Sequence, residues 1–333
     1  MRVGYGFWSC LQLVISARAV SLTKTRSCMV MALCSGLMSF SAFADTAPIA
    51  PEHDSDRVAH HQPMRVVTLF QGATDSAVAL GIQPVGVVDS WSDAKTYPYL
   101  RSALKGVEHV GLETQPNLEA IAALHPDLII GTTVRHEKIH SQLSHIAKTV
   151  YTDNVYDFQQ TLTRIAHATG REGKAQQLLR HWRARVANVR HALQRRQPHW
   201  PIRASIIDVR PDHLRLYLDK SFPGSILSAI GFTFPTISNA AGWGVKLKSK
   251  ESLPAVNADV FFVILHADTP AVQQNYQQWR HHPLWKMLSA PKHGQVSRVN
   301  RIDWLFSGGI LGANRLLDEL SRFYHLPPTT TQR

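Results

Sequence analysis

The sequence lacks cysteine and long apolar runs once its first 44 residues are set aside. All three cysteines, Cys10, Cys28 and Cys34, lie in that first segment. The rest of the chain therefore has no disulfide, no thiolate metal ligand and no cysteine nucleophile. Its most apolar run spans residues 260–265, far short of the roughly 20 residues that a membrane-spanning helix needs. We expect no stable membrane insertion of this part of the chain.

The first 44 residues have the composition of a secretory signal peptide. They contain four basic residues and no acidic residue, and an apolar run at 29–40 precedes the small residues Ala42 and Ala44. We expect cleavage after Ala44, followed by a flexible lead-in over residues 45–64, which are rich in Pro, His and Asp. A secreted, unanchored protein is retained only behind an outer membrane, so we expect it in the periplasm. The alternative is lipid anchoring at Cys34, which Leu33 disfavours because a small residue usually precedes an acylated cysteine.

The chain also lacks a dense basic tract of the kind that binds nucleic acid. Its formal net charge is +12, but the basic residues are scattered and are not interleaved with aromatic residues. A surplus of positive charge equally suits a small anionic ligand. No nucleotide-binding glycine loop and no nucleophile elbow occurs after residue 44. Together with secretion, these patterns argue against nucleic acid as a partner.

Strand and helix signals alternate from Arg65 onward. The apolar run at 127–131 is typical of a strand buried in a parallel sheet. This alternation predicts an N-terminal α/β lobe over residues 65–156 with a mainly parallel sheet. The expected strands are 66–69, 85–89, 127–131 and 149–151, and the expected helices are 74–80, 118–124 and 135–147.

A helical connector is expected over residues 157–197. Apolar residues recur at helical spacing, and no Gly or Pro lies between Lys174 and Gln197, so one helix of about 33 Å would join two lobes. A C-terminal α/β lobe is expected over 198–326, with a short tail at 327–333. Its expected strands are 204–209, 214–218, 260–265 and 296–299, and its expected helices are 225–230, 251–256, 272–288 and 309–324.

Five stretches of the sequence, in this order and spacing, resemble one known family. They are 115–121 (QPNLEAI), 126–130 (PDLII), 135–139 (RHEKI), 222–227 (FPGSIL) and 282–285 (HPLW). The chain from about 65 to 324 resembles the iron-siderophore and ferric-citrate substrate-binding proteins of ABC importers, a family that also includes vitamin B12 and haem binders. The resemblance implies two α/β lobes joined by one long helix, with the ligand in the cleft between them.

The same resemblance implies a binding protein and not an enzyme. The expected ligand is ferric citrate or a related ferric siderophore, and no cofactor is expected. The expected partners are an inner-membrane ABC permease and its ATPase subunits, to which a monomeric binding protein would deliver the ferric chelate. Haem, cobalamin and a free transition metal stay open as alternative ligands.

Two arginines are the main candidates for ligand contact, and a third is a further candidate. Ligands of α/β layers lie beyond the carboxyl ends of strands, and Arg135 and Arg210 follow the expected strands 127–131 and 204–209. Both also match positions where ferric-citrate-binding relatives carry arginine. Arg215, inside the next strand pattern, is a further candidate. A guanidinium group stays charged and binds a carboxylate through two hydrogen bonds, which suits a polyanionic chelate.

Three tryptophans in expected loops are candidates for the apolar walls of the cleft. They are Trp91, Trp243 and Trp304, and each is equally explained as a packing residue. After the position of Trp304, some ferric-citrate-binding relatives carry arginines, whereas this chain has LFSGG at 305–309. The difference favours a less anionic ligand than ferric citrate, such as a mixed citrate-hydroxamate siderophore.

Glu119 and Glu251 begin expected helices in opposite lobes and precede similar apolar patterns. An acidic residue in a first helical turn is ordinarily explained by the positive end of the helix dipole. In the family that the chain resembles, one exposed glutamate on each lobe docks against arginines of the permease. The resemblance therefore implies a permease-docking role for Glu119 and Glu251.

A rival interpretation is a zinc-dependent hydrolase. The run from His136 to His140 (HEKIH) fits the H-E-x-x-H pattern, which on one helix places two imidazoles together and Glu137 nearby as a general base. A third protein ligand is also needed, and His145 is the nearest histidine that follows. The remaining histidines are scattered, which favours a solvated role over capture of a free metal.

Overall fold

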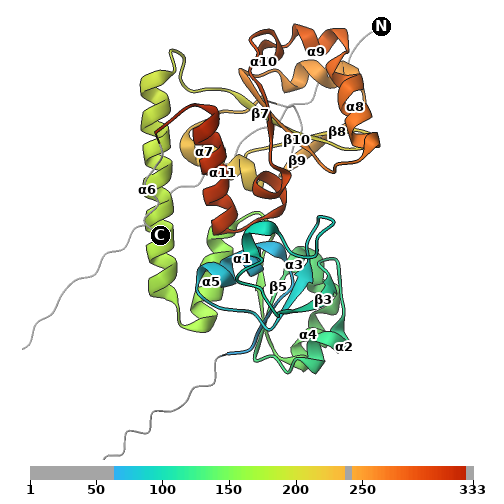
Figure 1. The fold of residues 1–333 in the computed structure, drawn as a ribbon, viewed down its shortest axis with the longest axis vertical. Coiled ribbons are helices and arrows are strands. Elements are labelled where there is room, and N and C mark those ends of the chain that lie inside the picture. The colour runs from blue at the N-terminus through green and yellow to red at the C-terminus, as the bar shows by residue number, and fades with distance from the viewer. Residues whose placement is uncertain (1–63, 237–241, 328–333) are drawn as a thin grey trace, which may run out of the picture. The chain divides into compact units, whose positions relative to one another are not determined.

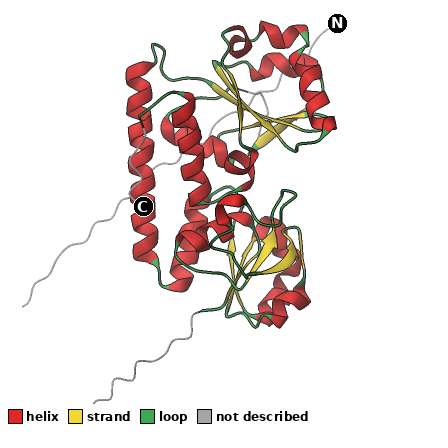
Figure 2. Cartoon of the chain, viewed as in Figure 1, coloured by secondary structure: helices red, strands yellow, loops and turns green. Residues whose placement is uncertain are grey.

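The computed structural model describes residues 64–236 and 242–327, all of which belong to one compact unit. The expected signal peptide with its cleavage site after Ala44, nearly all of the lead-in, and the end of the tail lie outside the described residues. The described part contains two sheets in separate lobes, with helices around each sheet (Figures 1 and 2). This arrangement confirms the predicted α/β class with two lobes.

The N-terminal lobe is built on a six-stranded sheet in the order β4-β3-β2-β1-β5-β6. All neighbouring strands are parallel except β3 and β4. The central strands β1 and β5 are buried on both faces, as their uninterrupted apolar sequences predict. The strands are β1 (Val66–Thr68), β2 (Gly86–Asp89), β3 (Glu108–Leu112), β4 (Gln115–Pro116), β5 (Leu128–Thr132) and β6 (Lys148–Thr152). The helices are α1 (Gln71–Ala79), η1 (Pro98–Leu100), α2 (Leu118–Ala123), α3 (Thr133–His136), η2 (Glu137–Ile139) and α4 (His140–Ile146).

Two helices follow this sheet and lead to the second lobe. Helix α5 (Phe158–Thr169) begins at Asp157, whose side chain accepts a hydrogen bond from Gln160 N, and ends at Gly170 in the left-handed conformation. Helix α6 (Glu172–Arg196) then runs for 25 residues beside both lobes (Figure 1). The predicted long connecting helix is confirmed. Within the described ranges, no helix combines the length and the apolar character that crossing a bilayer requires.

The C-terminal lobe has a five-stranded sheet in the order β11-β10-β7-β8-β9. The pairs formed by β10 are parallel, whereas β8 runs antiparallel to both of its neighbours. The strands are β7 (Ala204–Val209), β8 (Leu214–Tyr217), β9 (Gly244–Leu247), β10 (Val260–Leu265) and β11 (Val296–Val299). The helices are α7 (Phe222–Ile230), η3 (Lys250–Val256), α8 (Pro270–Arg280), α9 (Pro283–Met287), α10 (Ser289–Lys292), a π-helical turn η4 (Ile302–Phe306) and α11 (Ile310–Phe323).

Several predicted elements differ from the observed ones. The single helix predicted at 272–288 is divided into α8 and α9, because His282 adopts an extended conformation before Pro283. The helix predicted at 135–147 is three short helical segments, α3, η2 and α4. Strands β3, β4 and β9 were not predicted, since they are short and only partly buried and so lack a clear apolar pattern.

One apolar core extends through both lobes. It contains Phe70 of the N-terminal lobe, Phe158 and Trp182 of the connecting helices, and Phe262 and Trp304 of the C-terminal lobe. A close-packed interior resists displacement of its members. We infer that motion of the lobes relative to one another is small.

A buried carboxylate also links the two lobes. Asp75 on α1 accepts hydrogen bonds from the backbone N–H groups of Leu311 (2.8 Å) and Gly312 (2.9 Å) in the first turn of α11, and from the hydroxyl of Tyr99 (2.8 Å). A side chain at Gly309 would overlap this carboxylate. The carboxylate thus satisfies N–H groups that the helix itself leaves without partners.

Candidate ligand pocket

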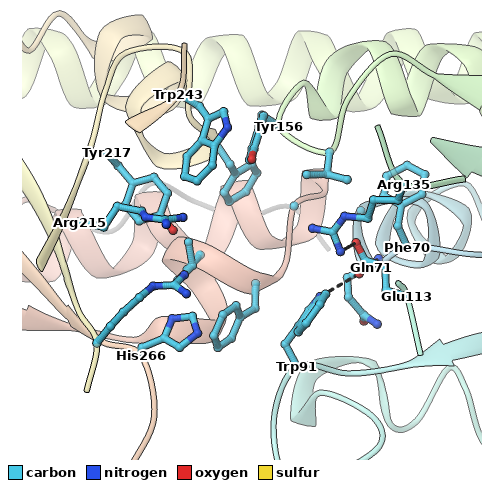
Figure 3. Close-up of a pocket in the computed structure, with 17 residues that line it drawn as sticks. Phe70, Gln71, Trp91, Glu113, Arg135, Tyr156, Arg215, Tyr217, Trp243 and His266 are labelled. Carbon is cyan, nitrogen blue, oxygen red and sulfur yellow. Dashed lines mark hydrogen bonds and ion pairs between the residues drawn. The ribbon is translucent and has the colours of Figure 1, made fainter. Parts of the chain in front are cut away.

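A cavity of about 320 Å³ is lined by residues of both lobes (Figure 3). Most of its polar lining residues follow the carboxyl ends of strands, where ligands of α/β layers bind. Trp91, Glu113 and Arg135 come after β2, β3 and β5, and Arg210 and His266 come directly after β7 and β10. We call this cavity the pocket. The rest of its wall is formed by Phe70, Gln71, Gly72, Val155, Tyr156, Arg215, Tyr217, Phe222, Trp243, Leu305, Phe306 and Gly308.

On the N-terminal side of the pocket, Arg135 is held by a carboxylate and an indole. Its guanidinium forms an ion pair with the buried Glu113 and lies over the ring of Trp91, 5.1 Å from the ring centroid. The indole N–H of Trp91 donates a hydrogen bond to Glu113 Oε2 at 2.9 Å. In Figure 3 these three side chains lie together on one wall. The contacts fix the direction of Arg135 before any ligand binds, which reduces the ordering cost of binding.

On the C-terminal side, Arg210 is held by Asp208, the penultimate residue of β7. Asp208 is fully buried, and its Oδ2 accepts a hydrogen bond from Arg210 Nε at 2.9 Å. Its Oδ1 lies 3.3 Å from Nδ1 of His266, whose ring packs edge-on against Phe306. Arg210 uses Nε for this contact, so the two terminal nitrogens of its guanidinium are directed elsewhere. The Arg210 side chain keeps about a quarter of its surface exposed.

Arg215 lies on the same side of the pocket and is held differently. Its guanidinium stacks over Trp243, 4.9 Å from the ring centroid, and has no hydrogen bond or ion pair to another described residue. Trp243 in turn packs against Tyr217 at 5.6 Å and Tyr156 at 5.3 Å. The five N–H donors of Arg215 are therefore positioned by an aromatic platform and not by a carboxylate.

Burial sets the charge of the other ionisable groups. It raises the pKa values of Tyr217 and Tyr156 above the ordinary phenol value, so both hydroxyls stay neutral hydrogen-bond donors. Burial also raises the pKa of Glu113, although Arg135 opposes this shift. Three arginines against one lining carboxylate leave the pocket net positive and suited to an anion.

Five of the six residues predicted to contact the ligand meet in this pocket. Arg135, Arg210, Arg215, Trp91 and Trp243 all line it. Trp304 requires correction as a wall residue. Its side chain is fully buried in the apolar core, with its ring centroid 4.7 Å from that of Phe262, and its indole N–H donates to Glu319 Oε2 at 2.9 Å. The one-turn π-helix η4 directs Trp304 into the core, and the neighbouring Leu305 and Phe306 face the pocket instead.

Sequence reasoning missed several lining residues. His266 directly follows β10, a strand that was predicted, so the strand-end rule that identified Arg210 applies to it equally. Glu113 follows β3, which was not predicted, and Tyr217 ends β8. Nothing in the spacing of Tyr217 indicated that its side chain would line the pocket.

The zinc-hydrolase interpretation is wrong for this chain. His136 is fully buried, its Nδ1 accepts a hydrogen bond from Thr132 N at 3.0 Å, and its Nε2 lies 2.9 Å from the carbonyl oxygen of Glu113, to which it donates. Both ring nitrogens are thus occupied. The motif also does not lie on one helix, because α3 ends at His136 and α4 begins at His140. Among the described residues, no group of three or more His, Cys, Asp or Glu is arranged to hold a metal ion.

Glu119 and Glu251 occupy matching positions in the two lobes. Each is exposed in the first turn of a short helix, and each helix has a side-chain cap, Asn117 for α2 and Ser249 for η3. Neither glutamate forms an ion pair with another described residue. Both carboxylates are therefore available to a partner surface.

Comparisons with known proteins place this chain in one family. Residues 66–300 match the family described as periplasmic binding protein. The chain is 52% identical to the achromobactin-binding periplasmic protein of Dickeya dadantii (strain 3937) over 78% of this chain and 86% of the relative. It is 28% identical to the Fe(3+) dicitrate-binding periplasmic protein FecB of Escherichia coli (strain K12), over 90% of this chain and 97% of the relative. The crystal structure of Staphylococcus aureus SirA complexed with staphyloferrin B superposes with a TM-score of 0.76 at 38% identity, covering 80% of this chain and 95% of that one.

Proposed function

Because the chain belongs to the family of periplasmic binding proteins, which bind substrates and are not enzymes, we propose that it captures an anionic ferric siderophore in the pocket. The observation that carries this proposal is the convergence of three arginines from two lobes on one cavity. Each arginine offers planar, bidentate hydrogen bonding to a carboxylate. The cavity volume of about 320 Å³ lies within the range of small-ligand sites.

We propose ferric achromobactin as the first ligand to test. The relative at 52% identity is achromobactin-binding, whereas the dicitrate-binding relative is only 28% identical. The residues that follow Trp304 support the same choice, since Leu305 and Phe306 give the pocket an apolar edge where further arginines would suit a more anionic chelate. Ferric citrate and ferric staphyloferrin B are the next candidates.

We also propose that the loaded protein acts in the periplasm and delivers the chelate to an ABC permease. Relatives with periplasmic binding roles support this location. The exposed Glu119 and Glu251 supply one carboxylate on each lobe. Two such charges contribute more to the orientation and specificity of an interface than to its affinity. A transient delivery complex requires this balance.

Titration of intrinsic tryptophan fluorescence tests the proposed ligand. Trp91 and Trp243 lie in the pocket, so ferric achromobactin is expected to quench their emission saturably, with a Kd of about 1 µM or lower. The comparison ligands are ferric citrate, ferric staphyloferrin B, iron-free achromobactin, a ferric trihydroxamate, haem, cobalamin and zinc. Absorption by the ligand itself is corrected with free tryptophan.

A variant resolves which tryptophans respond. Replacing Trp91 and Trp243 by phenylalanine should remove most of the quenching, while the emission of the buried Trp304 stays nearly constant. Saturable binding of zinc or haem, with no response to any siderophore complex, would overturn the proposed function.

The docking role is tested with the double variant E119A/E251A. We expect it to bind the ferric chelate with wild-type affinity but to support uptake of iron-55 in a strain lacking the wild-type protein at a rate reduced about tenfold or more, because the permease loses one charge contact on each lobe. The matched control is E108A/D219A, which removes two other exposed acids. Equal uptake rates for the two double variants would refute docking through Glu119 and Glu251.

A further inference from the structure

Glu113 is the single acid among the described residues that line the pocket. The other charged lining residues are Arg135, Arg210 and Arg215, with His266 adding positive charge when it is protonated. A buried carboxylate in a site for anions opposes binding by direct repulsion, and repulsion is strong where water is excluded. Its presence therefore needs a physical explanation beyond packing.

The contacts of Glu113 show one part of that explanation. Its side chain is 3% exposed, and all of its partners are donors: the guanidinium of Arg135, the indole N–H of Trp91 at 2.9 Å and the backbone N–H of Gln71 at 3.3 Å. Figure 3 shows this carboxylate between Arg135 and Trp91, with Gln71 beside it. Glu113 thus positions Arg135 and Trp91, two of the side chains with which the N-terminal lobe lines the pocket.

Among the described groups that line the pocket or contact Glu113, Glu113 is the acid whose negative charge an approaching anion repels. On α3, Arg135 stays charged, and His136 stays neutral because both of its nitrogens are bonded and burial lowers its pKa. On the other elements, α1 contributes the neutral Gln71, and the loops contribute Trp91, Tyr97 and Tyr156, the last two with pKa values raised by burial. Across the pocket lie Arg210, Arg215 and His266.

We propose, building on the proposed function, that Glu113 selects ligands by charge, because an anionic chelate bound beside its carboxylate makes the protein take up a proton there. A chelate with more uncompensated carboxylates repels the Glu113 carboxylate more strongly. A larger fraction of Glu113 is then protonated in the complex. A chelate with fewer carboxylates binds with Glu113 ionised. The pocket thereby favours moderately anionic complexes over ferric dicitrate, and affinity for anionic complexes rises as the pH falls.

The sign of this effect follows from linkage. A bound anion raises the pKa of Glu113 further, so the complex holds more protons than the free protein. Affinity then increases with decreasing pH by up to about tenfold per pH unit for one proton. Burial has already raised the pKa of Glu113 in the free protein, which reduces the cost of protonating it.

The test compares wild type, E113Q and E113D by isothermal titration with ferric achromobactin and ferric dicitrate at several pH values between about 5 and 8, in buffers of different ionisation enthalpy. The buffer comparison counts the protons taken up on binding. E113Q is expected to take up fewer protons, to lose most of the pH slope, and to improve its affinity for ferric dicitrate relative to ferric achromobactin by about tenfold. E113D keeps the charge and is expected to keep the slope. His266 is present in all three proteins, so they differ only in the side chain at position 113.

The matched control is E319Q. Glu319 also accepts an indole N–H, that of Trp304, and its pKa is also raised by burial, but it does not line the pocket. E319Q should leave unchanged both the number of protons taken up on binding and the ratio of the affinities for the two chelates. If E113Q weakens both chelates equally and keeps the wild-type proton count, Glu113 only positions its neighbours and the inference is wrong. If the wild-type protein binds neither chelate, the proposed function fails first and the inference with it.

Discussion

Replacing Arg210 and Arg215 together by alanine is expected to weaken binding of the ferric chelate by about 10²–10⁴-fold. A hydrogen bond from a charged donor contributes about 1.5–3 kcal/mol, and tenfold in affinity corresponds to about 1.4 kcal/mol. The two residues are the arginines that the C-terminal lobe directs into the pocket. Arg215 should account for a large share, because its donors have no partner among the described residues apart from the face of Trp243. Fluorescence titration measures the loss.

Two controls separate loss of ligand contact from loss of structure. Removing Arg210 takes away one of the two ion-pair partners of the buried Asp208 and leaves His266, so the thermal unfolding of the double variant must be measured beside its affinity. The single variant R215A leaves no buried charge without its ion-pair partner and should by itself weaken binding about 10–100-fold. R183A/R280A removes two exposed arginines outside the pocket and should bind normally. Wild-type affinity in R210A/R215A would show that the ligand binds elsewhere.

The arginines could be located from the sequence because two simple rules coincide there. Runs such as 127–131 and 204–209 are apolar enough to identify a buried strand, and ligands lie beyond the carboxyl ends of such strands. Arg210 follows its strand directly, and Arg135 follows after one turn. The same rule would have located His266 after β10. The long helix could also be predicted from the sequence, because its length depends on local periodicity and on the absence of Gly and Pro.

The remaining part of the site depends on tertiary structure that the sequence does not indicate. Glu113 follows the half-buried strand β3, whose residues do not alternate clearly, so its place at a strand end could not be recognised. Trp304 lies close in sequence to the pocket residues Leu305 and Phe306, and only the π-helical turn decides which of the three faces the core. The pairing of Asp208 with both Arg210 and His266 requires β7 and β10 to be neighbours, which is a property of strand order.

The contact of Asp75 with α11 also depends on tertiary structure that the sequence does not indicate. This carboxylate and its donors on α11 are separated by more than 230 residues in the chain, and they lie where α1 of one lobe meets α11 of the other. Its burial is complete, and the loss of solvation raises the pKa of Asp75 from 3.8 to about 6, although Leu311 N, Gly312 N, Tyr99 and Arg315 each favour the ionised form. Ionised Asp75 thus costs free energy in the folded chain even with its donors in place.

The free energy of unfolding is therefore expected to depend on pH through Asp75. A carboxyl group with a higher pKa in the folded chain binds its proton more tightly there. Its stabilising contribution is fully present below the unfolded value of 3.8 and is lost as the pH rises through about 6. Two pKa units correspond to about 3 kcal/mol. In D75N this contribution is absent, so the difference in unfolding free energy between wild type and D75N should fall by about 2 kcal/mol from about pH 4 to pH 7.

Urea denaturation at a series of pH values measures this difference, in which the titration of all other groups cancels. D259N is the matched control, since Asp259 also accepts a backbone N–H, that of Arg203 at 2.8 Å, but at an exposed position. The free energy of unfolding of D259N should depend on pH in the same way as that of the wild type. The same pH dependence in D75N as well would mean that Asp75 does not change its protonation on unfolding. The expected slope would instead show that the folded chain gains stability relative to the unfolded chain in acid, because protonation relieves the desolvation of Asp75 where α1 meets α11.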